Sequence, residues 1–332
     1  MNDADTPLPA RPSLASLTGT PVLVVGAGGF IGRHLTALLA ERGARVTAGV
    51  RCGGARLASR RFRPPHAVAE FDGAVAGSLG RLIGEVRPAF VVNLLAYGVH
   101  ADQRDLQLAQ RINVECVGEL VDALADARDA GALPPWPAAR LVHAGTVAEY
   151  GEASGDLVES TPTQPTTLYG RTKLAGTLLL LARARERALR SAVARLFMVY
   201  GGGERPPRLL PSLLAAAERE GPIDLTAGKQ RRDFTWVGDV AEGLVRLAAA
   251  QGVGEGEVVH LATGRLTAVR DFVLAAAQEL RIETGRLRFG ALPSDGAEQR
   301  LASVSVERLR QLTNWIPDTS PTDGVRRTLA GL

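Results

Sequence analysis

The fold is decided by the stretch PVLVVGAGGFIGRHLTALL at residues 21–39. Its apolar, β-branched run 21–25 predicts a buried strand, and the leucines that follow the glycines repeat at helical spacing. Gly26, Gly29 and Gly32 stand three residues apart, so the backbone can turn sharply, approach a ligand and let the helix pack closely on its strand. The helix N-terminus then faces the ligand, which makes this turn a candidate pyrophosphate site.

The same alternation continues along the chain. Strand-like apolar runs follow at residues 45–50, 90–95, 141–143, 192–197 and 258–261, and segments of helical length separate most of them. Strands that alternate with helices predict an α/β fold with a Rossmann-like, doubly wound parallel sheet.

The residue composition of the chain changes after Tyr200, where three glycines and several prolines occur. We therefore expect a disordered tail at 1–18, a nucleotide-binding Rossmann domain at 19–200 and 232–264, and a smaller C-terminal substrate-binding lobe at 201–231 and 265–332. Ligands of open α/β sheets bind at the carboxyl ends of the strands, so the lobe is expected to lie over that edge.

Composition excludes several classes of protein. The 332 residues are 45% hydrophobic with a net charge of +4, which suits an anionic ligand but falls short of the concentrated basic face of a nucleic-acid-binding protein. We expect no membrane span, because no run approaches about 18 uncharged apolar residues. Cys52 and Cys116 are too few for a disulfide framework or a metal cluster, so we expect no metal. They fit a cytoplasmic protein, as does an N-terminus without the pattern of a secretory signal.

Tyr169 and Lys173 form the candidate catalytic pair. They stand one helical turn apart and therefore on one face of a helix. A nearby cation would lower the tyrosine pKa from its usual value near 10, so that the phenol could exchange a proton with a carbonyl or alcohol oxygen while a hydride moves. With four tyrosines and two lysines in the chain, a chance pair at this spacing is expected about 0.02 times.

These two patterns together resemble the extended short-chain dehydrogenase/reductase family, which includes NAD(P)-dependent nucleotide-sugar epimerases, dehydratases and 4-ketoreductases. The glycines follow its G-x-x-G-x-x-G spacing, with Phe30 and Ile31 inside the motif, although the literal G-x-G-x-x-G fingerprint is not met. The resemblance implies that this turn binds the cofactor, that Tyr169 donates a proton, and that Lys173 tunes it and holds the ribose.

Further matches imply the rest of the catalytic site. Thr146, four residues before Tyr150, corresponds to the family's hydroxyl that hydrogen-bonds the reacting substrate oxygen, although Gly145 replaces the usual serine. Asn113 corresponds to a helix asparagine that orders water or backbone near the lysine, and a helix-packing role is an equal alternative.

Other matches concern the cofactor. Asp72 resembles the aspartate that accepts a hydrogen bond from the adenine amino group, and a plain turn aspartate is the alternative. Leu95, Ala96 and Tyr97 resemble the segment that carries the central part of the cofactor.

The end of the second strand favours NADP(H). Val50 stands where NAD-dependent relatives carry an acid, and Arg51 follows it, so a 2′-phosphate would meet a guanidinium instead of a repelling carboxylate. Arg56, Arg60 and Arg61 come close behind. A solvated, arginine-rich loop is the alternative.

The segment RRDFTWVGDV at 231–240 resembles the R-D-F-x-x-V-x-D-V pattern of enzymes that act on nucleotide sugars. In them the arginine that matches Arg232 contacts the substrate diphosphate. The alternative for Arg232 is an internal ion pair with Asp233 or Asp239. Met198 replaces a frequent asparagine that touches the substrate.

Residues near Thr146 disfavour two reactions of the family. Val147 and Ala148 stand where dehydratases carry Asp-Glu, so dehydration is disfavoured, and Ala148 also replaces the cysteine that some epimerases use. Farther along the chain, Gly202 replaces the proline of a common Tyr-Gly-Pro turn.

We therefore predict NADPH-dependent reduction of an NDP-4-keto-6-deoxyhexose, as by a dTDP-sugar 4-ketoreductase. An NDP-sugar 4-epimerase with tightly bound NAD and a non-catalytic NADP-binding scaffold or sensor remain open. The resemblance also implies a homodimer, packed through the helix after Asp105 and the helix that begins at Tyr169.

Overall fold

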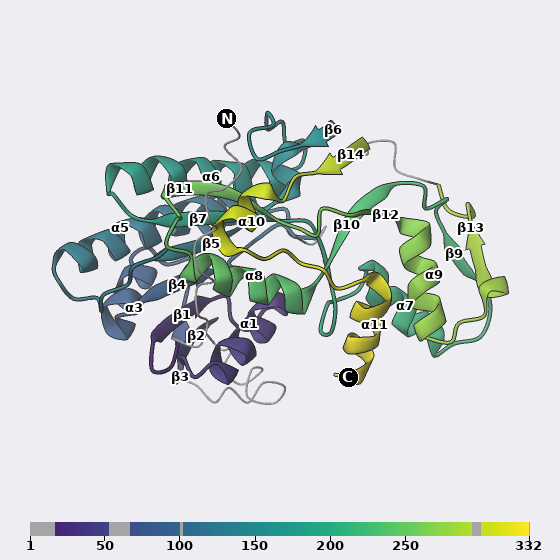
Figure 1. The fold of residues 1–332 in the computed structure, drawn as a ribbon, viewed down its shortest axis with the longest axis horizontal. Helices are drawn as coiled ribbons and strands as arrows, with labels where there is room; N and C mark the ends of the chain where they lie inside the picture. The colour runs from purple at the N-terminus through teal and green to yellow at the C-terminus, as the bar shows by residue number, and fades with distance from the viewer. Residues whose placement is uncertain (1–16, 53–66, 100–101, 294–299, 332) are drawn as a thin grey trace, which may run out of the picture.

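The computed structural model describes residues 17–52, 67–99, 102–293 and 300–331. Its centre is a parallel seven-stranded sheet with the strand order β11-β7-β5-β4-β1-β2-β3 (Figure 1). The strands are β1 (Pro21–Val25), β2 (Arg45–Arg51), β3 (Ala67–Phe71), β4 (Phe90–Asn93), β5 (Leu141–Thr146), β7 (Ser191–Leu196) and β11 (Glu255–Leu261). The predicted Rossmann-like, doubly wound α/β fold is confirmed. Because the strand order runs outward from β1 in both directions, the carboxyl ends of β1 and β4 form the edge at which such folds bind ligands.

Helices cover both faces of this sheet. One face carries α1 (Phe30–Glu41), α8 (Val237–Ala249) and α10 (Glu307–Thr313), and the other carries α3 (Ser78–Val86), α5 (Cys116–Asp129) and α6 (Leu168–Glu186). The side chains of strand β1 show why both faces are covered. Its side chains alternate between the faces, so Val22 and Val24 pack with the first set of helices while Leu23 and Val25 pack with the second. All four are fully buried, which explains why β1 reads as a continuous apolar run.

A second apolar core lies beyond the sheet. It is built from α7 (Leu209–Ala217), α9 (Val269–Glu279) and α11 (Pro321–Ala330), the three-stranded sheet β12 (Leu266–Ala268), β10 (Arg231–Trp236) and β8 (Met198–Tyr200), and the pair β9 (Ile223–Leu225) and β13 (Leu287–Phe289). Phe234 and Phe272 stack there with ring centroids 4.1 Å apart. Figure 1 shows this group to one side of the main sheet.

The remaining elements are short. Strands β6 (Ser154–Leu157) and β14 (Arg300–Val304) pair in parallel, and short turns of helix form η2 (Arg111–Glu115), η3 (Val147–Tyr150) and η4 (Thr284–Arg286). Helix α10 returns from the predicted lobe to the main core, where Leu309 is fully buried. Helix α10, which was predicted to belong to the lobe, thus packs on the main sheet. The domain boundaries remain a prediction.

The start of the described chain also joins the core. Residues 1–16 of the predicted tail lie outside the described residues, whereas Leu17 is buried with the residues beneath α1. The backbone N–H of Gly19 donates to the carbonyl of Gly43, which holds this segment against the turn before β2.

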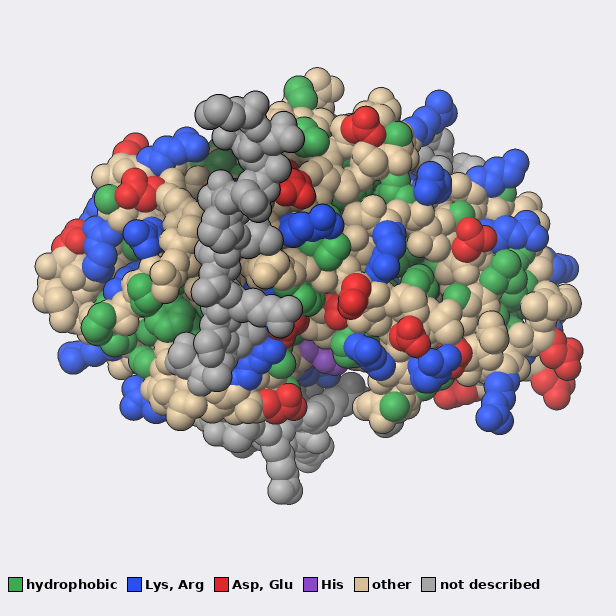
Figure 2. Space-filling view, viewed as in Figure 1, with side chains coloured by type: hydrophobic (Ala, Val, Ile, Leu, Met, Phe, Trp, Pro, Cys, Tyr) green, Lys and Arg blue, Asp and Glu red, His purple; other side chains and the backbone are tan. Residues whose placement is uncertain are grey.

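On the face shown in Figure 2, acidic and basic side chains are interspersed. None of the helices in the described part of the chain combines the length and apolarity that a membrane crossing requires. Within the same residues, no group of three or more His, Cys, Asp or Glu side chains is placed to hold a metal ion.

Candidate active site

The glycine turn lies where β1 passes into α1. Gly26 has φ +84°, and a Cβ on it would lie 3.0 Å from the carbonyl carbon of Leu94 at the end of β4. A Cβ on Gly32 would lie 2.5 Å from the carbonyl oxygen of Gly26, so only glycine lets α1 pack this closely on the turn. Gly29 is the N-cap of α1 and provides no side-chain cap. A dinucleotide pyrophosphate fits this arrangement, because backbone and helix N–H groups face it without a side chain in between.

Phe30 and Ile31 are the first two residues of α1 and are partly buried. The end of β2 lies next to the turn. Val50 is buried, and its Cγ1 lies 3.7 Å from the position of a Cβ on Gly28, so an apolar side chain packs where an acid would otherwise stand. Arg51 is the last residue of β2 and is exposed.

The other predicted phosphate ligands, Arg56, Arg60 and Arg61, lie outside the described residues.

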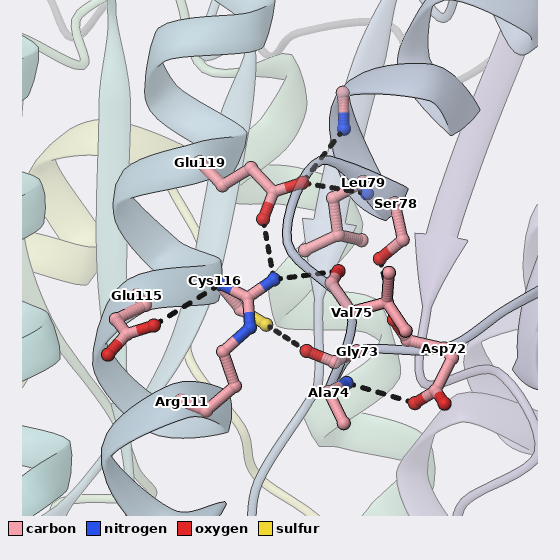
Figure 3. Close-up of polar contacts among 11 residues, drawn as sticks. Asp72, Gly73, Ala74, Val75, Ser78, Leu79, Arg111, Glu115, Cys116 and Glu119 are labelled. Carbon is pink, nitrogen blue, oxygen red and sulfur yellow. Dashed lines mark hydrogen bonds and ion pairs between the residues drawn. The ribbon is translucent and has the colours of Figure 1, made fainter.

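Asp72 follows β3 at the same edge of the sheet (Figure 3). Its Oδ1 accepts a hydrogen bond from the backbone N–H of Ala74 at 2.9 Å, and its carbonyl oxygen accepts one from the Ser78 hydroxyl at 2.6 Å. Asp72 thus shapes its own turn, as the plain turn alternative requires, and it is also partly exposed at the edge where an adenine would lie.

This turn is fixed to the neighbouring helix by a polar cluster, also drawn in Figure 3. Arg111 donates to the carbonyl of Val75 at 3.0 Å and to Glu119 at 2.7 Å. Glu119 in turn accepts from the backbone N–H of Leu79 at 2.9 Å, in the first turn of α3. The thiol of Cys116 donates to a backbone carbonyl of the same loop, and burial raises its pKa to about 11, so this cysteine is a structural thiol.

Thr146 and Tyr169 lie close together. Thr146 ends β5, and Tyr169 lies in the first turn of α6, near enough for the Thr146 side chain to lower the pKa of the phenol. Thr146 also caps η3, because its Oγ1 accepts from the N–H of Ala148 and its own N–H donates to Glu149 Oε1 at 3.0 Å. This local cap holds the hydroxyl of Thr146 at the end of the strand.

The predicted lowering of the Tyr169 pKa by Lys173 is wrong for this structure. Burial raises the pKa of Tyr169 to about 12, and the negative charge of Glu149 acts in the same direction, although the Thr146 hydrogen bond opposes both. The Lys173 side chain instead reaches behind β5, where its Nζ lies 2.9 Å from His143 Nε2. Lys173 is only 1% exposed, and burial lowers its own pKa to about 8. The phenol is therefore held in its protonated form.

Asn113 orders backbone near this site. Its side chain accepts from the N–H of Tyr97 at 2.9 Å and donates to the carbonyl of Tyr97 at 2.8 Å and to the Thr172 hydroxyl at 2.9 Å. The π-helical turn η2 brings Asn113 against α6, and a Cβ on Gly176 would lie 1.9 Å from the Asn113 carbonyl oxygen. Asn113 thus joins the segment Leu95 to Tyr97 to the helix that carries Tyr169 and Lys173.

A buried ion pair under Thr146 was missed by sequence reasoning. Glu149 is fully buried and accepts from Arg195 Nε at 2.9 Å, while Arg195 is 3% exposed and lies over the Tyr150 ring at 4.4 Å from its centroid. The pair also explains Gly145. A Cβ on Gly145 would lie 2.9 Å from Glu149 Oε1, so the usual serine leaves no room for the pair. The sequence offered one signal for this pair, because Glu149 and Arg195 are charged residues that each stand within an otherwise apolar segment.

Arg232 lies in β10, partly buried, and its guanidinium donates to the carbonyl of Arg231 at 2.9 Å. The two aspartates considered as its partners are engaged elsewhere. Asp233 accepts hydrogen bonds from Thr263, and Asp239 accepts from Thr319. These bonds fix β10 and α8 to the segments that follow β11 and α10.

The two departures noted in the sequence lie at the start of the second part. Met198 is the first residue of β8 and pairs in register with Phe234 of β10. The carbonyl oxygen of Gly202 is 2.7 Å from His34 Nε2, and Arg33 donates to the carbonyl of Gly203 at 2.9 Å. The loop after β8 is thereby attached to α1, the helix of the glycine turn.

Comparison with known proteins agrees with this geometry. The chain is 30% identical over 313 residues to dTDP-6-deoxy-L-talose 4-dehydrogenase (NAD(P)(+)) of Kitasatospora kifunensis, covering 92% of this chain and 93% of that protein. It is 28% identical over 329 residues to dTDP-glucose 4,6-dehydratase of Neisseria gonorrhoeae, covering 93% and 94%.

Among solved structures, MoeE5 in complex with UDP-glucuronic acid and NAD aligns with a TM-score of 0.73 and 28% identity, over 93% of this chain and 97% of that one. The sequence profile of the NAD dependent epimerase/dehydratase family matches residues 22–262, which include the glycine turn, Thr146, Tyr169 and Lys173. The chain belongs to the NAD-dependent epimerase/dehydratase family.

Proposed function

We propose that the protein reduces the keto group of an NDP-4-keto-6-deoxyhexose with NADPH, as a dTDP-sugar 4-ketoreductase does. One observation carries the assignment of the proton donor. Burial raises the pKa of Tyr169 to about 12, so the phenol keeps its proton and can act as a general acid. Reduction of a ketone needs such an acid at the oxygen, whereas oxidation of an alcohol needs a base.

The chain's own residues supply the proton and the orientation. Bound NADPH would supply the hydride that forms the new C–H bond at the carbonyl carbon. Tyr169 transfers its hydroxyl proton to the carbonyl oxygen, so an alcohol and a phenolate result, and the phenolate then regains a proton from solvent. Thr146 donates a hydrogen bond to the same oxygen, which orients the ketone and stabilises the charge that develops on it.

The cofactor would lie along the carboxyl edge of the sheet. The turn from Gly26 to Gly32 would hold its pyrophosphate, Asp72 its adenine, and the segment from Leu95 to Tyr97 its central part. Arg51 favours NADPH over NADH, because the neighbouring Val50 presents no carboxylate to repel a 2′-phosphate. Lys173 would contact the nicotinamide ribose by turning its Nζ away from His143.

The substrate assignment is supported by Arg232 and by relatives. The guanidinium of Arg232, near the start of β10, suits a sugar-nucleotide diphosphate. The Kitasatospora relative is named as a dehydrogenase at position 4 of a dTDP-6-deoxysugar, and reduction at that position is the reverse reaction. Dehydration is disfavoured because Val147 and Ala148 of η3 provide neither of the acid and base groups that loss of water requires.

The test is direct. The purified protein is mixed with dTDP-4-keto-6-deoxyglucose and NADPH, and loss of nicotinamide absorbance is followed together with the formation of the reduced sugar. Tyr169→Phe should lower turnover about 10²- to 10⁴-fold, the usual contribution of a general acid. Tyr200→Phe is the matched control, since its hydroxyl bonds only a backbone carbonyl in the second core at 3.3 Å among the contacts described.

Two results would replace this proposal. Cofactor that co-purifies with the protein, with turnover in the absence of added NADPH, would show the 4-epimerase with bound NAD. Binding of NADPH without turnover of any of several NDP-ketosugars would favour the non-catalytic scaffold.

We also propose a homodimer that packs through α4 (Leu106–Gln110) and α6. Leu106 is 62% exposed and Leu178 is 55% exposed, which are large values for leucine side chains on adjoining helices. Burial of both in a partner interface would explain them. Sedimentation velocity of the parent and of Leu178→Glu should give a dimer and a monomer.

A further inference from the structure

A chain of hydrogen bonds runs behind the catalytic residues, entirely inside the protein. Lys173 Nζ is 2.9 Å from His143 Nε2, His143 Nδ1 is 3.0 Å from Asn93 Nδ2, and Asn93 Oδ1 is 3.0 Å from the backbone N of Leu95. Asn93 and His143 are 0% exposed and Lys173 is 1% exposed. Bulk solvent does not reach these side chains, so a hydrogen that points along one of these contacts needs an acceptor on the facing group.

The positions of the hydrogens follow from the backbone end of the chain. The N–H of Leu95 can only donate, so the Asn93 atom that faces it is the oxygen. The Asn93 amide nitrogen then faces His143 and donates to Nδ1, which must be the unprotonated nitrogen of the ring. A neutral imidazole with a bare Nδ1 carries its hydrogen on Nε2, and this hydrogen points at Lys173 Nζ.

The contact between His143 Nε2 and Lys173 Nζ determines the charge of Lys173. An ammonium has three hydrogens and no lone pair, so it cannot accept from His143 Nε2–H, whereas a neutral amine can. We propose that His143 and Asn93 hold Lys173 as a neutral amine in the cofactor-free protein. They are positioning residues for Lys173, and protonation of the amine requires the imidazole to move its hydrogen to Nδ1 and Asn93 to turn away from Leu95.

The groups around this chain agree with that assignment. Burial lowers the pKa of His143 well below its ordinary value, so the ring is neutral. Burial also lowers the pKa of Lys173 to about 8. Burial alone would leave most of the lysine charged at about pH 7, so the neutral amine depends on the hydrogen that His143 Nε2 presents to it. Glu149 is the charged group that opposes this, since its carboxylate favours the ammonium form, but its charge is shared with Arg195. Tyr169, the remaining titratable neighbour on α6, is neutral.

The role of this amine in turnover rests on the proposed function, whereas its protonation state in the free protein does not. The test therefore uses the protein without cofactor or substrate. Proton-detected ¹⁵N spectra of the imidazole rings distinguish a hydrogen on Nε2 from one on Nδ1, and His143→Gln identifies the signals of His143.

The chain provides its own control. His260 is also fully buried, but its Nδ1 faces the carbonyl oxygen of Ser305 at 2.9 Å and its Nε2 faces the Tyr150 hydroxyl at 2.6 Å. A carbonyl only accepts, so His260 carries its hydrogen on Nδ1. We expect two neutral rings of opposite tautomer. A hydrogen on Nδ1 of His143, or a charged His143 ring, would overturn the proposal.

A second variant tests the causal link. In Asn93→Asp both side-chain oxygens accept, so one still receives the Leu95 N–H while the other receives a hydrogen from Nδ1. His143 should change tautomer, and Nε2 should become an acceptor for the Lys173 ammonium, while His260 keeps its signals. If His143 keeps its hydrogen on Nε2 in a folded Asn93→Asp protein, Asn93 does not control the ring.

Lysine carbon spectra report the charge itself. The chain contains only Lys173 and Lys229, so ¹³C-labelled lysine gives two side-chain signals, and the exposed Lys229 serves as the reference. The Lys173 midpoint should rise in Asn93→Asp by about one pH unit, a tenfold change in the protonation constant. The new carboxylate also attracts the ammonium, so the shift supports the proposal when His143 changes tautomer in the same variant, whether or not a ketosugar is reduced. An unchanged midpoint would contradict the proposal even if the enzyme reduces ketosugars.

Discussion

The buried ion pair between Glu149 and Arg195 allows a sharp test of how the catalytic strand end is held. Glu149→Gln keeps the size of the side chain and an oxygen that can accept from the Thr146 N–H, but it removes the negative charge. Arg195, 3% exposed, then remains as a buried cation without its carboxylate partner. Removal of one partner from a buried pair costs about 3–5 kcal/mol of unfolding free energy.

The expected change in melting temperature follows from chain length. At about 2.1 cal/mol/K per residue, the 332 residues give an unfolding entropy of about 0.7 kcal/mol/K. A loss of about 3–5 kcal/mol therefore lowers the midpoint by roughly 4–7 °C. Differential scanning calorimetry of the parent and the variant measures this shift.

Two further variants isolate the cause. Asp224→Asn removes one partner of an exposed pair with Arg288 and should leave the midpoint near that of the parent, because solvent and salt screen such pairs. Glu149→Gln combined with Arg195→Met removes both charges and should recover more than half of the loss. If Glu149→Gln alone has the same melting temperature as the parent, or if the double variant is less stable than the single one, the pair does not hold the strand end as described.

Three further predictions follow from the same contacts. Gly145→Ser should cost about 1–3 kcal/mol of stability, because its Cβ would lie 2.8 Å from Val193 Cγ1 and 2.9 Å from Glu149 Oε1; urea denaturation measures this, and a neutral effect would show that the site has spare room. Asn113→Ala should lose three hydrogen bonds and weaken NADPH binding in a fluorescence titration, and unchanged affinity would leave Asn113 a packing residue. Burial raises the pKa of Glu204 to about 7, so the folded state binds its proton more tightly and stability falls as pH rises from about 4.5 to about 7. Glu204→Gln should therefore gain stability relative to the parent at pH above about 7 and gain little near pH 4.5, and an equal difference at both pH values would contradict this.

The sequence by itself determined the features that depend on near neighbours. The glycine spacing of residues 26–32 specifies a strand-turn-helix unit, since positive φ and close packing are local demands on the backbone. Alternation of strands and helices then specifies the sheet class. Tyr169 and Lys173 could be assigned to one helix face because the helical repeat alone sets their spacing.

Only the tertiary structure decided where buried charges find their partners. Arg195 lies opposite Gly145 in the register of β5 and β7 and reaches Glu149, 46 residues away in sequence. His143 meets Lys173 across 30 residues. Such contacts depend on strand order and register, which no local pattern encodes. The direction of the Tyr169 pKa shift was mispredicted for the same reason, because it depends on burial and on where the Lys173 side chain points.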